Sequence, residues 1–376
     1  MRILHIISGD LWAGAEVQVF QTLLDLNSRN NLSIMCVVFN HGKLFNKFKQ
    51  FGIEHTIIDE NLNNTAIMLW KLQKVIKNYI PDIIHVHRNK EHFLGFFAGL
   101  LSFRKIPIIR TIHGLSNVSK SMSFVKHFRS NVVLGLDSLL IQLCAKEIIA
   151  VSQDLKDILS LKRPKGKINL IYNSVNLKYI QSFAHGLNHR EKLGIGDLFW
   201  IGACARLVEV KNLTMLIRSA GYLAKKGFPF RVSIFGDGPQ QKTLESLISQ
   251  LDLKNFVKMH GFEDNILAAI NSLDVFVLCS HHEGLPMSLL EAMALGRAVV
   301  CTAVGGMKEI VHQGINGLLV ADNDSVALAE ALFSLYKDNN LLEKLSREAR
   351  ATIGSQFNII NANDILIKIY SDCKKK

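Results

Sequence analysis

Residues 275–301 read Val275-Phe-Val-Leu278-Cys-Ser-His-His-Glu283-Gly-Leu-Pro-Met-Ser-Leu-Leu-Glu291-Ala-Met-Ala-Leu-Gly-Arg-Ala298-Val-Val-Cys301. The short apolar runs Val275–Leu278 and Ala298–Cys301 are typical of buried strands. Between them, Gly and Pro mark a turn, and Leu289–Leu295 has the composition of a helix. Two strands joined through a helix are parallel neighbours in one sheet. This stretch therefore predicts an α/β fold.

The same alternation runs along the whole chain of 376 residues, a length that suggests two domains. Further strands are predicted at Arg2–Ile7, Ser33–Phe39, Glu54–Ile58, Ile83–Val86, Ile108–Ile112, Glu147–Val151, Lys167–Ile171, Phe199–Arg206, Phe230–Phe235 and Val257–His260. Helices are predicted at Glu16–Ser28, Ala66–Tyr79, His92–Leu101, Leu213–Lys226, Gln240–Leu251 and Ser325–Tyr336. The pattern stops over residues 176–198 and then restarts. We therefore expect two doubly wound parallel-sheet domains facing a cleft, with ligands at the carboxyl ends of the strands.

The bulk composition narrows the class of protein. No apolar run reaches the roughly 18 residues of a membrane span, and the start of the chain favours a first strand over a signal peptide. The six cysteines form no C-x-x-C pair, as expected for buried thiols in the cytoplasm. The net charge is +12, and residues 1–185 hold 23 Lys and Arg against 12 Asp and Glu, a surplus of +11. Such a surplus attracts anionic partners, although a generally basic proteome would also produce it.

Glu283 and Glu291 are the first candidate ligand-binding residues. Ser288 is the expected N-cap of the helix, which would put Glu291 in the first turn and Glu283 in the preceding loop. A helix N-terminus suits a diphosphate, and a carboxylate accepts hydrogen bonds from two vicinal hydroxyls of a sugar. Alternatively, Glu291 only stabilises the start of the helix.

Cations and glycines follow two other strands. Arg206 ends a strand, and Lys211 lies in the loop before the next helix, so both can neutralise a diphosphate. The turn Gly236-Asp-Gly238-Pro also follows a strand, but it lacks the third glycine of a dinucleotide fingerprint. Two solvated surface charges are the alternative interpretation of this pair.

Taken together, these strings resemble the retaining glycosyltransferases of family 4, which have the GT-B fold. The resemblance rests on Glu283 and Glu291 at E-x7-E spacing, on the Arg206 and Lys211 string, on Gly305-Gly-Met-Lys-Glu309 and on Asn316-Gly317. It covers most of the chain and is strongest over 199–320. It implies an acceptor-binding domain at 1–185, a nucleotide-sugar donor domain at 186–354, and a C-terminal helix at about 355–376 that packs back on the first domain.

The resemblance also implies roles for individual residues. The catalytic candidates are Arg206, Lys211, Glu283 and His113, where Glu283 contacts the transferred sugar and Arg206 with Lys211 stabilises the leaving diphosphate. The donor-binding candidates are Gly14, Glu16, Gly236, Gly238, His260, Gly284, Leu285, Pro286, Met287 and Glu291. Glu291 takes the ribose hydroxyls, while for His260 only the backbone is implicated. Ala13 stands where the family usually has a glycine, which alters the loop that precedes Gly14.

The partners follow from the same comparison. A nucleotide-sugar donor and a glycan or lipid-linked acceptor are expected, with no cofactor and no metal, although His281 and His282 precede Glu283. His85 and His87 are expected near the cleft. Lys120–Arg129 mixes basic and apolar residues, which suits either an acidic membrane surface or an ordinary amphipathic helix. The expected location is the cytoplasm, at the inner membrane face. No nucleic-acid motif is present. Rival functions are a nucleotide-sugar epimerase and a non-enzymatic nucleotide-sugar binding protein.

Overall fold

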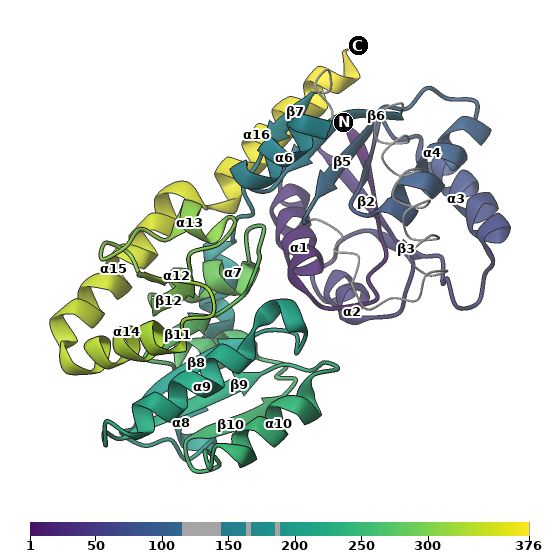
Figure 1. Ribbon diagram of the computed structural model, residues 1–376. Coiled ribbons are helices and arrows are strands. Elements are labelled where there is room, and N and C mark those ends of the chain that lie inside the picture. Colours follow the sequence, from purple (N-terminus) through teal and green to yellow (C-terminus); the bar gives the residue numbers. More distant parts are fainter. Residues whose placement is uncertain (115–143, 163–166, 185–188, 376) are drawn as a thin grey trace. The chain divides into compact units, whose positions relative to one another are not determined.

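The structure is a computed structural model that describes residues 1–114, 144–162, 167–184 and 189–375 (Figure 1). The chain forms two compact units, Met1–Asn173 with Ile359–Lys376, and Ser174–Asn358. The division after Asn173 precedes the boundary predicted at 185, so residues 174–185 belong to the second unit. The membrane-contact candidate Lys120–Arg129 lies outside the described residues.

The first unit is built on a parallel sheet of seven strands in the order β3-β2-β1-β4-β5-β6-β7. Its strands are β1 (Arg2–Ile7), β2 (Ser33–Val38), β3 (His55–Ile57), β4 (Ile83–Val86), β5 (Ile108–Ile112), β6 (Ala145–Ala150) and β7 (Ile168–Leu170). Its described helices are α1 (Gly14–Asn27), α2 (Lys43–Gln50), α3 (Thr65–Tyr79), α4 (Asn89–Leu101), α6 (Gln153–Lys162) and α16 (Ile359–Lys374).

The second unit repeats this architecture with six parallel strands in the order β10-β9-β8-β11-β12-β13. They are β8 (Phe199–Cys204), β9 (Phe230–Phe235), β10 (Val257–Gly261), β11 (Val275–Leu278), β12 (Ala298–Thr302) and β13 (Leu318–Val320). The helices are α7 (Leu177–Ala184), α8 (His189–Lys192), η1 (Glu209–Lys211), α9 (Leu213–Ala224), α10 (Gln241–Gln250), α11 (Ile266–Asn271), α12 (Met287–Ala294), α13 (Met307–Ile310), α14 (Ser325–Lys337) and α15 (Asn339–Gln356). Along the chain, β9 and β10 are added on one side of β8, and β11, β12 and β13 on its other side. Doubly wound sheets bind ligands at the point where the strand order reverses in this way, here between β8 and β11.

Buried apolar side chains on both faces of the strands explain why the sequence predicted them well. All six residues of β8 are buried, and so are all four of β11. Parallel strands covered by helices on both sides read as continuous apolar runs rather than as alternating ones. The two predicted doubly wound sheets are therefore confirmed, and β13 is an additional short strand at the sheet edge.

The start of α12 differs from the prediction. Pro286, not Ser288, is the N-cap residue, with an extended backbone (φ −74°, ψ 125°), and the helix begins at Met287. Proline suits a helix start because it has no N–H that needs a partner within the helix. The earlier start leaves no acidic residue in the first turn, so Glu291 lies on the second turn.

Among the described residues, no helix combines the length and the apolar character that crossing a bilayer requires. The C-terminal helix α16 belongs to the first unit, although α15 immediately before it belongs to the second (Figure 1).

Candidate active site

Two loops meet at the carboxyl edge of the second sheet, on either side of the strand reversal. Lys211 follows β8, Glu283 follows β11, and the Lys211 ammonium forms an ion pair with the Glu283 carboxylate. Ser280 Oγ donates a hydrogen bond to the same carboxylate at 2.6 Å, and the His281 amide donates to the Val210 carbonyl at 2.8 Å. The structure thus brings together two residues that are 72 positions apart.

Arg206 lies on the same edge and is exposed. Its guanidinium forms no ion pair or hydrogen bond with the residues that the structure describes, whereas Lys211 is held by Glu283. A free guanidinium on the same sheet edge as a paired ammonium can attract an anion, because the fork of N–H donors matches phosphate oxygens.

The glycines of the Gly236-Asp-Gly238 turn hold the Arg206 loop against the β9 exit. Gly236 has φ +130°, and a Cβ there would lie 2.0 Å from the Ala205 carbonyl oxygen. A Cβ at Gly238 would lie 2.5 Å from the Leu207 carbonyl oxygen. The Leu207 amide donates to the Asp237 carbonyl at 2.8 Å. These two glycines therefore let two backbone segments approach closely, and this contact sets the position of Arg206.

A second pair of glycines supports the Glu283 loop. Gly305 has φ +47°, and the Gly306 amide donates to the Glu283 carbonyl at 3.1 Å. A Cβ on Gly306 would lie 1.8 Å from the Gly284 carbonyl oxygen. The Gly305-Gly306 turn therefore packs directly on the backbone that carries Glu283.

We expect Gly306→Ala to lower the free energy of unfolding by about 1–3 kcal/mol, because the new methyl group overlaps backbone rather than a flexible side chain. Urea unfolding measures this change. The matched control is Gly354→Ala within α15, where an added Cβ meets nothing within 4 Å. That variant should gain up to about 1 kcal/mol from helix propensity. Equal stability of the two variants would contradict the packing argument.

Glu291 is buried on α12, with 8% of its surface exposed. Burial raises the pKa of its carboxyl to about 8, from an ordinary value of 4.5. The carboxyl forms no ion pair or hydrogen bond with other described residues. It raises the pKa of the phenol of Tyr179 on α7 and of the Cys204 thiol at the end of β8, although burial is the larger cause for both. An unpaired buried carboxyl of this kind is common where a ligand binds.

Other candidates of the second unit have side chains that are packed against neighbouring residues. The side chains of Leu285 and Met287 belong to the buried core. The His260 ring stacks on Phe235 with centroids 4.8 Å apart, and its Nε2 is 3.0 Å from Ser233 Oγ. Burial lowers the pKa of His260 to about 4. The His260 ring is thus held by packing and by a polar contact within its own unit.

In the first unit, Glu16 holds its own loop together. Its side chain is fully buried, accepts a hydrogen bond from the Ala13 amide at 3.3 Å and forms an ion pair with Arg88. The sequence assigns Glu16 to donor binding, whereas in the structure its carboxylate contacts the Ala13 amide and Arg88. Gly14, the first residue of α1, is exposed and leaves the backbone accessible there.

Glu91 on α4 was missed by the sequence interpretation. Its buried carboxylate accepts hydrogen bonds from the backbone amides of Ser8, His87 and Arg88 at 2.6–2.9 Å. It therefore ties the exit of β1 to the exit of β4. A glutamate three residues after a helix N-cap is a recognisable signal for such capping.

His113 follows β5, and its environment differs from that of a solvated side chain. Its Nε2 is 3.2 Å from His87 Nδ1, while its Nδ1 is buried and has no hydrogen-bond partner among the described residues. Burial lowers the pKa of His113 to about 4. His85 and His87, expected at the cleft, are instead buried, with 2% and 7% of their surface exposed.

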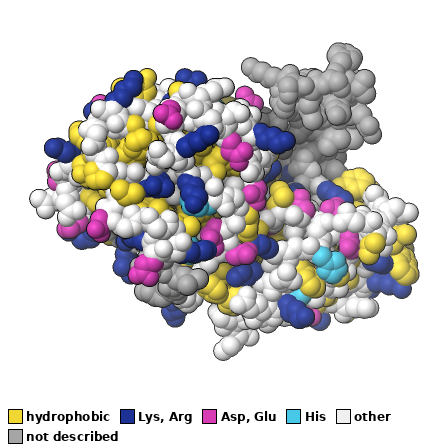
Figure 2. All heavy atoms as spheres, turned by 90° about the horizontal axis from the view of Figure 1, so that it is seen from below, with side chains coloured by type: hydrophobic (Ala, Val, Ile, Leu, Met, Phe, Trp, Pro, Cys, Tyr) yellow, Lys and Arg dark blue, Asp and Glu magenta, His cyan; other side chains and the backbone are white. Residues whose placement is uncertain are grey.

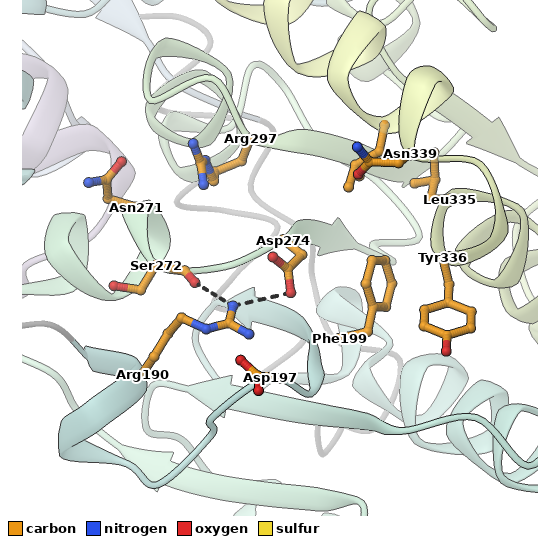
Figure 3. A pocket seen from close by; sticks show the side chains of 11 residues that line it. Arg190, Asp197, Phe199, Asn271, Ser272, Asp274, Arg297, Leu335, Tyr336 and Asn339 are labelled. Carbon is orange, nitrogen blue, oxygen red and sulfur yellow. Dashed lines mark hydrogen bonds and ion pairs between the residues drawn. The ribbon is translucent and has the colours of Figure 1, made fainter.

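A cavity of about 670 Å³ in the second unit lies away from Lys211 and Glu283 (Figure 3). Its lining includes Phe199, Asp274 and Arg297, at or just before the amino ends of β8, β11 and β12. Arg190 bridges this edge, because it donates to the Ser272 carbonyl and to Asp274, each at 3.2 Å (Figure 3). The carboxyl edge carries the candidate chemistry, whereas this cavity belongs to the opposite edge.

Charge is mixed on the face of the molecule drawn in Figure 2. On the face drawn in Figure 2, Lys and Arg side chains are interspersed with Asp and Glu side chains and with apolar patches. The basic surplus of the sequence therefore does not gather into one continuous stripe on that face.

Two family models match the chain almost end to end. "Glycosyltransferase Family 4" matches residues 12–179, and "Glycosyl transferases group 1" matches residues 187–352. The chain belongs to glycosyltransferase family 4. The second model covers Arg206, Lys211, Glu283 and Glu291, on the edge where the structure assembles the site.

The relatives and solved structures agree with this family and fold. The putative colanic acid biosynthesis glycosyltransferase WcaL of Salmonella typhimurium is 37% identical over 45% of this chain and 44% of its own length. The first two relatives are thus matched over less than half of their length. An Escherichia coli galactosyltransferase, described as UDP-Gal:alpha-D-GlcNAc-diphosphoundecaprenol alpha-1,3-galactosyltransferase, is 28% identical over 81% of this family 4 chain and 79% of its own.

Among solved structures, Anabaena HepE in complex with UDP-glucose superposes with a TM-score of 0.84. It is 23% identical, and the match covers 99% of this chain and 100% of HepE. The predicted GT-B architecture of two Rossmann-like domains is therefore confirmed.

Proposed function

We propose that the protein is a retaining glycosyltransferase that moves a sugar from a nucleotide-sugar donor to a glycan or lipid-linked acceptor in polysaccharide biosynthesis. The observation that carries this proposal is the carboxyl edge of the second sheet. There the Lys211–Glu283 pair and the free Arg206 guanidinium lie at the exits of the two strands where the strand order reverses.

The chemistry follows from these charges. The bond between the anomeric carbon and the diphosphate oxygen breaks, and the acceptor oxygen bonds to the same face of that carbon. The proton of the acceptor hydroxyl passes to the departing phosphate oxygen, so that no protein base is needed. Arg206 and Lys211 stabilise the negative charge that grows on the diphosphate, while Glu283 orients the sugar and Glu291 holds the ribose hydroxyls. The proposed reaction uses no metal and no cofactor.

The donor and acceptor classes are supported by the relatives. HepE is solved with UDP-glucose, and the Escherichia coli relative is described as a UDP-galactose enzyme acting on a diphosphoundecaprenol-linked sugar. We therefore propose a uridine diphosphate sugar as the donor. An acceptor anchored in a membrane suits a protein that works at the cytoplasmic face, where the basic and apolar segment Lys120–Arg129 would contact acidic lipid.

A thermal-shift screen against UDP, GDP, ADP and CMP, with and without EDTA, tests the donor site. We expect UDP to raise Tm, with no effect of EDTA, because a ligand that binds only the folded state stabilises it. Arg206→Ala should lose most of this shift. The control Arg218→Ala removes an exposed arginine from α9 in the same unit and should keep it.

The outcomes separate the rival functions. No shift with any nucleotide at millimolar concentration would contradict the donor site. A shift combined with conversion of the nucleotide-sugar in the absence of an acceptor would instead indicate an epimerase. A shift with no turnover of any nucleotide-sugar would indicate a binding protein.

A further inference from the structure

One face of the first sheet carries an unusual row of polar side chains. His5 on β1 is directly paired with His85 on β4, and His87 lies two residues further along the chain. Because side chains alternate between the two faces of a strand, His85 and His87 share a face, as do Thr111 and His113 at the end of β5. The opposite face of β1 and β4 packs its Leu and Ile side chains into the apolar core.

These side chains form a continuous hydrogen-bonded chain. His113 Nε2 is 3.2 Å from His87 Nδ1, and His87 Nε2 is 3.3 Å from His5 Nδ1. His87 thus uses one ring nitrogen for His113 and the other for His5. The chain ends at the buried Nδ1 of His113, which has no partner among the described residues.

The other end of the chain runs through the C-terminal helix. The hydroxyl of Tyr370 on α16 is 3.3 Å from His5 Nε2 and 2.6 Å from His85 Nδ1. The second nitrogen of His85, Nε2, is 2.8 Å from Thr111 Oγ1. Tyr370 is fully buried.

All four imidazoles are neutral near pH 7. Burial lowers the pKa of His5 to about 3 and that of His113 to about 4, and it lowers the pKa values of His85 and His87 well below the usual value. A neutral imidazole has one N–H donor and one lone pair. Each ring can therefore donate to only one of its two neighbours.

This restriction leaves two arrangements for the whole chain, each with the same number of protons. In the first, Tyr370 donates to His85 Nδ1, His85 donates to Thr111, and His5, His87 and His113 all carry their proton on Nε2. In the second, donor and acceptor exchange roles in each of these hydrogen bonds, and His113 carries its proton on Nδ1. A mixed arrangement would place two protons or none between a pair of neighbours, which a buried network does not tolerate.

The two distances at the Tyr370 hydroxyl favour the first arrangement. A hydroxyl donor forms shorter hydrogen bonds than a ring N–H donor. The 2.6 Å contact to His85 fits donation by the hydroxyl, and the 3.3 Å contact to His5 fits donation by the ring. His113 Nδ1 then carries a lone pair that has no partner in the described part of the protein, at the end of the chain.

A metal is the other ligand that a histidine cluster suggests, since one nitrogen from each of His5, His85 and His87 lies within 4.8 Å of the others. A metal ion needs lone pairs that converge on one point about 2.0–2.1 Å from each nitrogen. The rings of His85 and His87 are stacked, with centroids 4.6 Å apart and planes at 27°. Their lone pairs therefore lie in two separate, nearly parallel planes and do not converge on one nearby point, which suits a hydrogen-bonded chain better than a metal.

We propose that Tyr370, His85, His5 and His87 act as positioning residues that fix the tautomer of His113, so that its Nδ1 accepts a hydrogen bond from a hydroxyl group of a sugar ligand. The choice of a sugar hydroxyl rests on the proposed function. The tautomer itself does not depend on that function. It couples the C-terminal helix to a side chain at the carboxyl end of β5.

The test is the tautomer of His113 in the full-length protein labelled with ¹⁵N-histidine. NMR distinguishes a protonated from an unprotonated ring nitrogen, and the His113 signals are assigned by their loss in His113→Gln. We expect Nε2–H in the wild type. In Tyr370→Phe, the His5 Nε2–H would lose its acceptor in the core, which is costly. The chain should then reverse, making Nδ1–H the major form of His113.

Two further variants complete the test. Tyr79→Phe removes another buried hydroxyl of the same unit, which donates to the Ser33 carbonyl at 2.6 Å, and should leave His113 unchanged. Thr111→Val removes the acceptor of His85 without shortening the side chain. It should shift the tautomer of His113 toward Nδ1–H, as Tyr370→Phe does, and it provides the test if Tyr370→Phe folds poorly. An unchanged His113 tautomer in both folded variants would overturn the proposal. Stoichiometric Zn²⁺ binding that shifts the His5, His85 and His87 signals together would also overturn it.

Activity provides a separate measurement. With a sugar substrate, Tyr370→Phe should lower kcat by about 10-fold, which corresponds to the loss of about 1.4 kcal/mol of transition-state stabilisation by one hydrogen bond. Tyr79→Phe should leave kcat unchanged. The NMR measurement needs no substrate, so failure of the sugar-transfer proposal and failure of the tautomer proposal are distinguishable.

Discussion

Lys211→Ala is expected to lower kcat more than about 100-fold while the protein remains folded, since a charge donor aimed at a developing anion contributes about 10²–10³ in rate. The variant removes the ammonium that pairs with Glu283 and leaves that carboxylate, 13% exposed, with only the Ser280 hydroxyl as a described partner. The loss combines a missing cation for the diphosphate with a carboxylate that repels it. Steady-state kinetics measure kcat, and circular dichroism checks the fold.

The control for this prediction is Lys226→Ala. Lys226 also pairs with a glutamate of the same unit, Glu330 at 2.8 Å, but it follows the end of α9, in the connection that leads to the amino end of β9. Its removal should change kcat less than about twofold, because exposed ion pairs contribute little. Near-normal activity of Lys211→Ala would rule out the proposed role of Lys211.

Glu291→Gln is expected to raise the stability of the folded protein at high pH and to weaken nucleotide binding. The pKa of Glu291 is about 8 in the folded protein and has an ordinary value of 4.5. The folded state therefore holds this proton up to about pH 8, whereas the unfolded chain loses it near pH 4.5. The free energy of unfolding consequently falls as pH rises through this window. Glutamine, which stays neutral, avoids the loss, so the variant should match the wild type at pH 4 and melt higher at pH 9. Each kcal/mol gained corresponds to about 2–4 °C in Tm.

The same substitution should weaken UDP binding by about 10-fold, because an ionised carboxylate accepts two hydroxyl hydrogen bonds more strongly than an amide does. Calorimetry at pH 7 in buffers of different ionisation enthalpy should show a proton released when UDP binds to the wild type and none with Glu291→Gln. Glu245→Gln, on the exposed face of α10, is the control and should change neither property. Unchanged UDP affinity would show that Glu291 does not contact the nucleotide. Unchanged Tm at pH 9 would contradict the raised pKa of its carboxyl.

The fold was predictable because its strands are short apolar runs that helices cover on both faces. β9 and β11 have the predicted limits, while β2 and β8 end earlier than expected. The start of α12 was predicted wrongly, since Ser288 has a capping side chain but Pro286 has the backbone that ends an extended segment. The capping preference of Ser288 therefore predicted the wrong helix start, because the backbone conformation of the preceding loop sets the N-cap at Pro286.

The site was predictable only as a set of residues. Sequence spacing identified Lys211 and Glu283 separately, and their ion pair appears only when the exits of β8 and β11 become neighbours. Glu16 was assigned to the donor because the sequence does not show that Arg88, 72 residues later, takes its carboxylate. Likewise, no local pattern connects Tyr370 with His5, which are 365 residues apart.

The path of the chain has a consequence for how such proteins can be recombined. The second unit, Ser174–Asn358, is an insertion within the first, and its two ends are adjacent because the Val175 amide donates to the Phe357 carbonyl at 2.9 Å. An inserted segment with neighbouring ends can be exchanged as a single cassette. Grafting the 174–358 segment of a relative between these two points should transfer nucleotide preference. The tyrosine of the last helix would then stay with the histidines that it contacts.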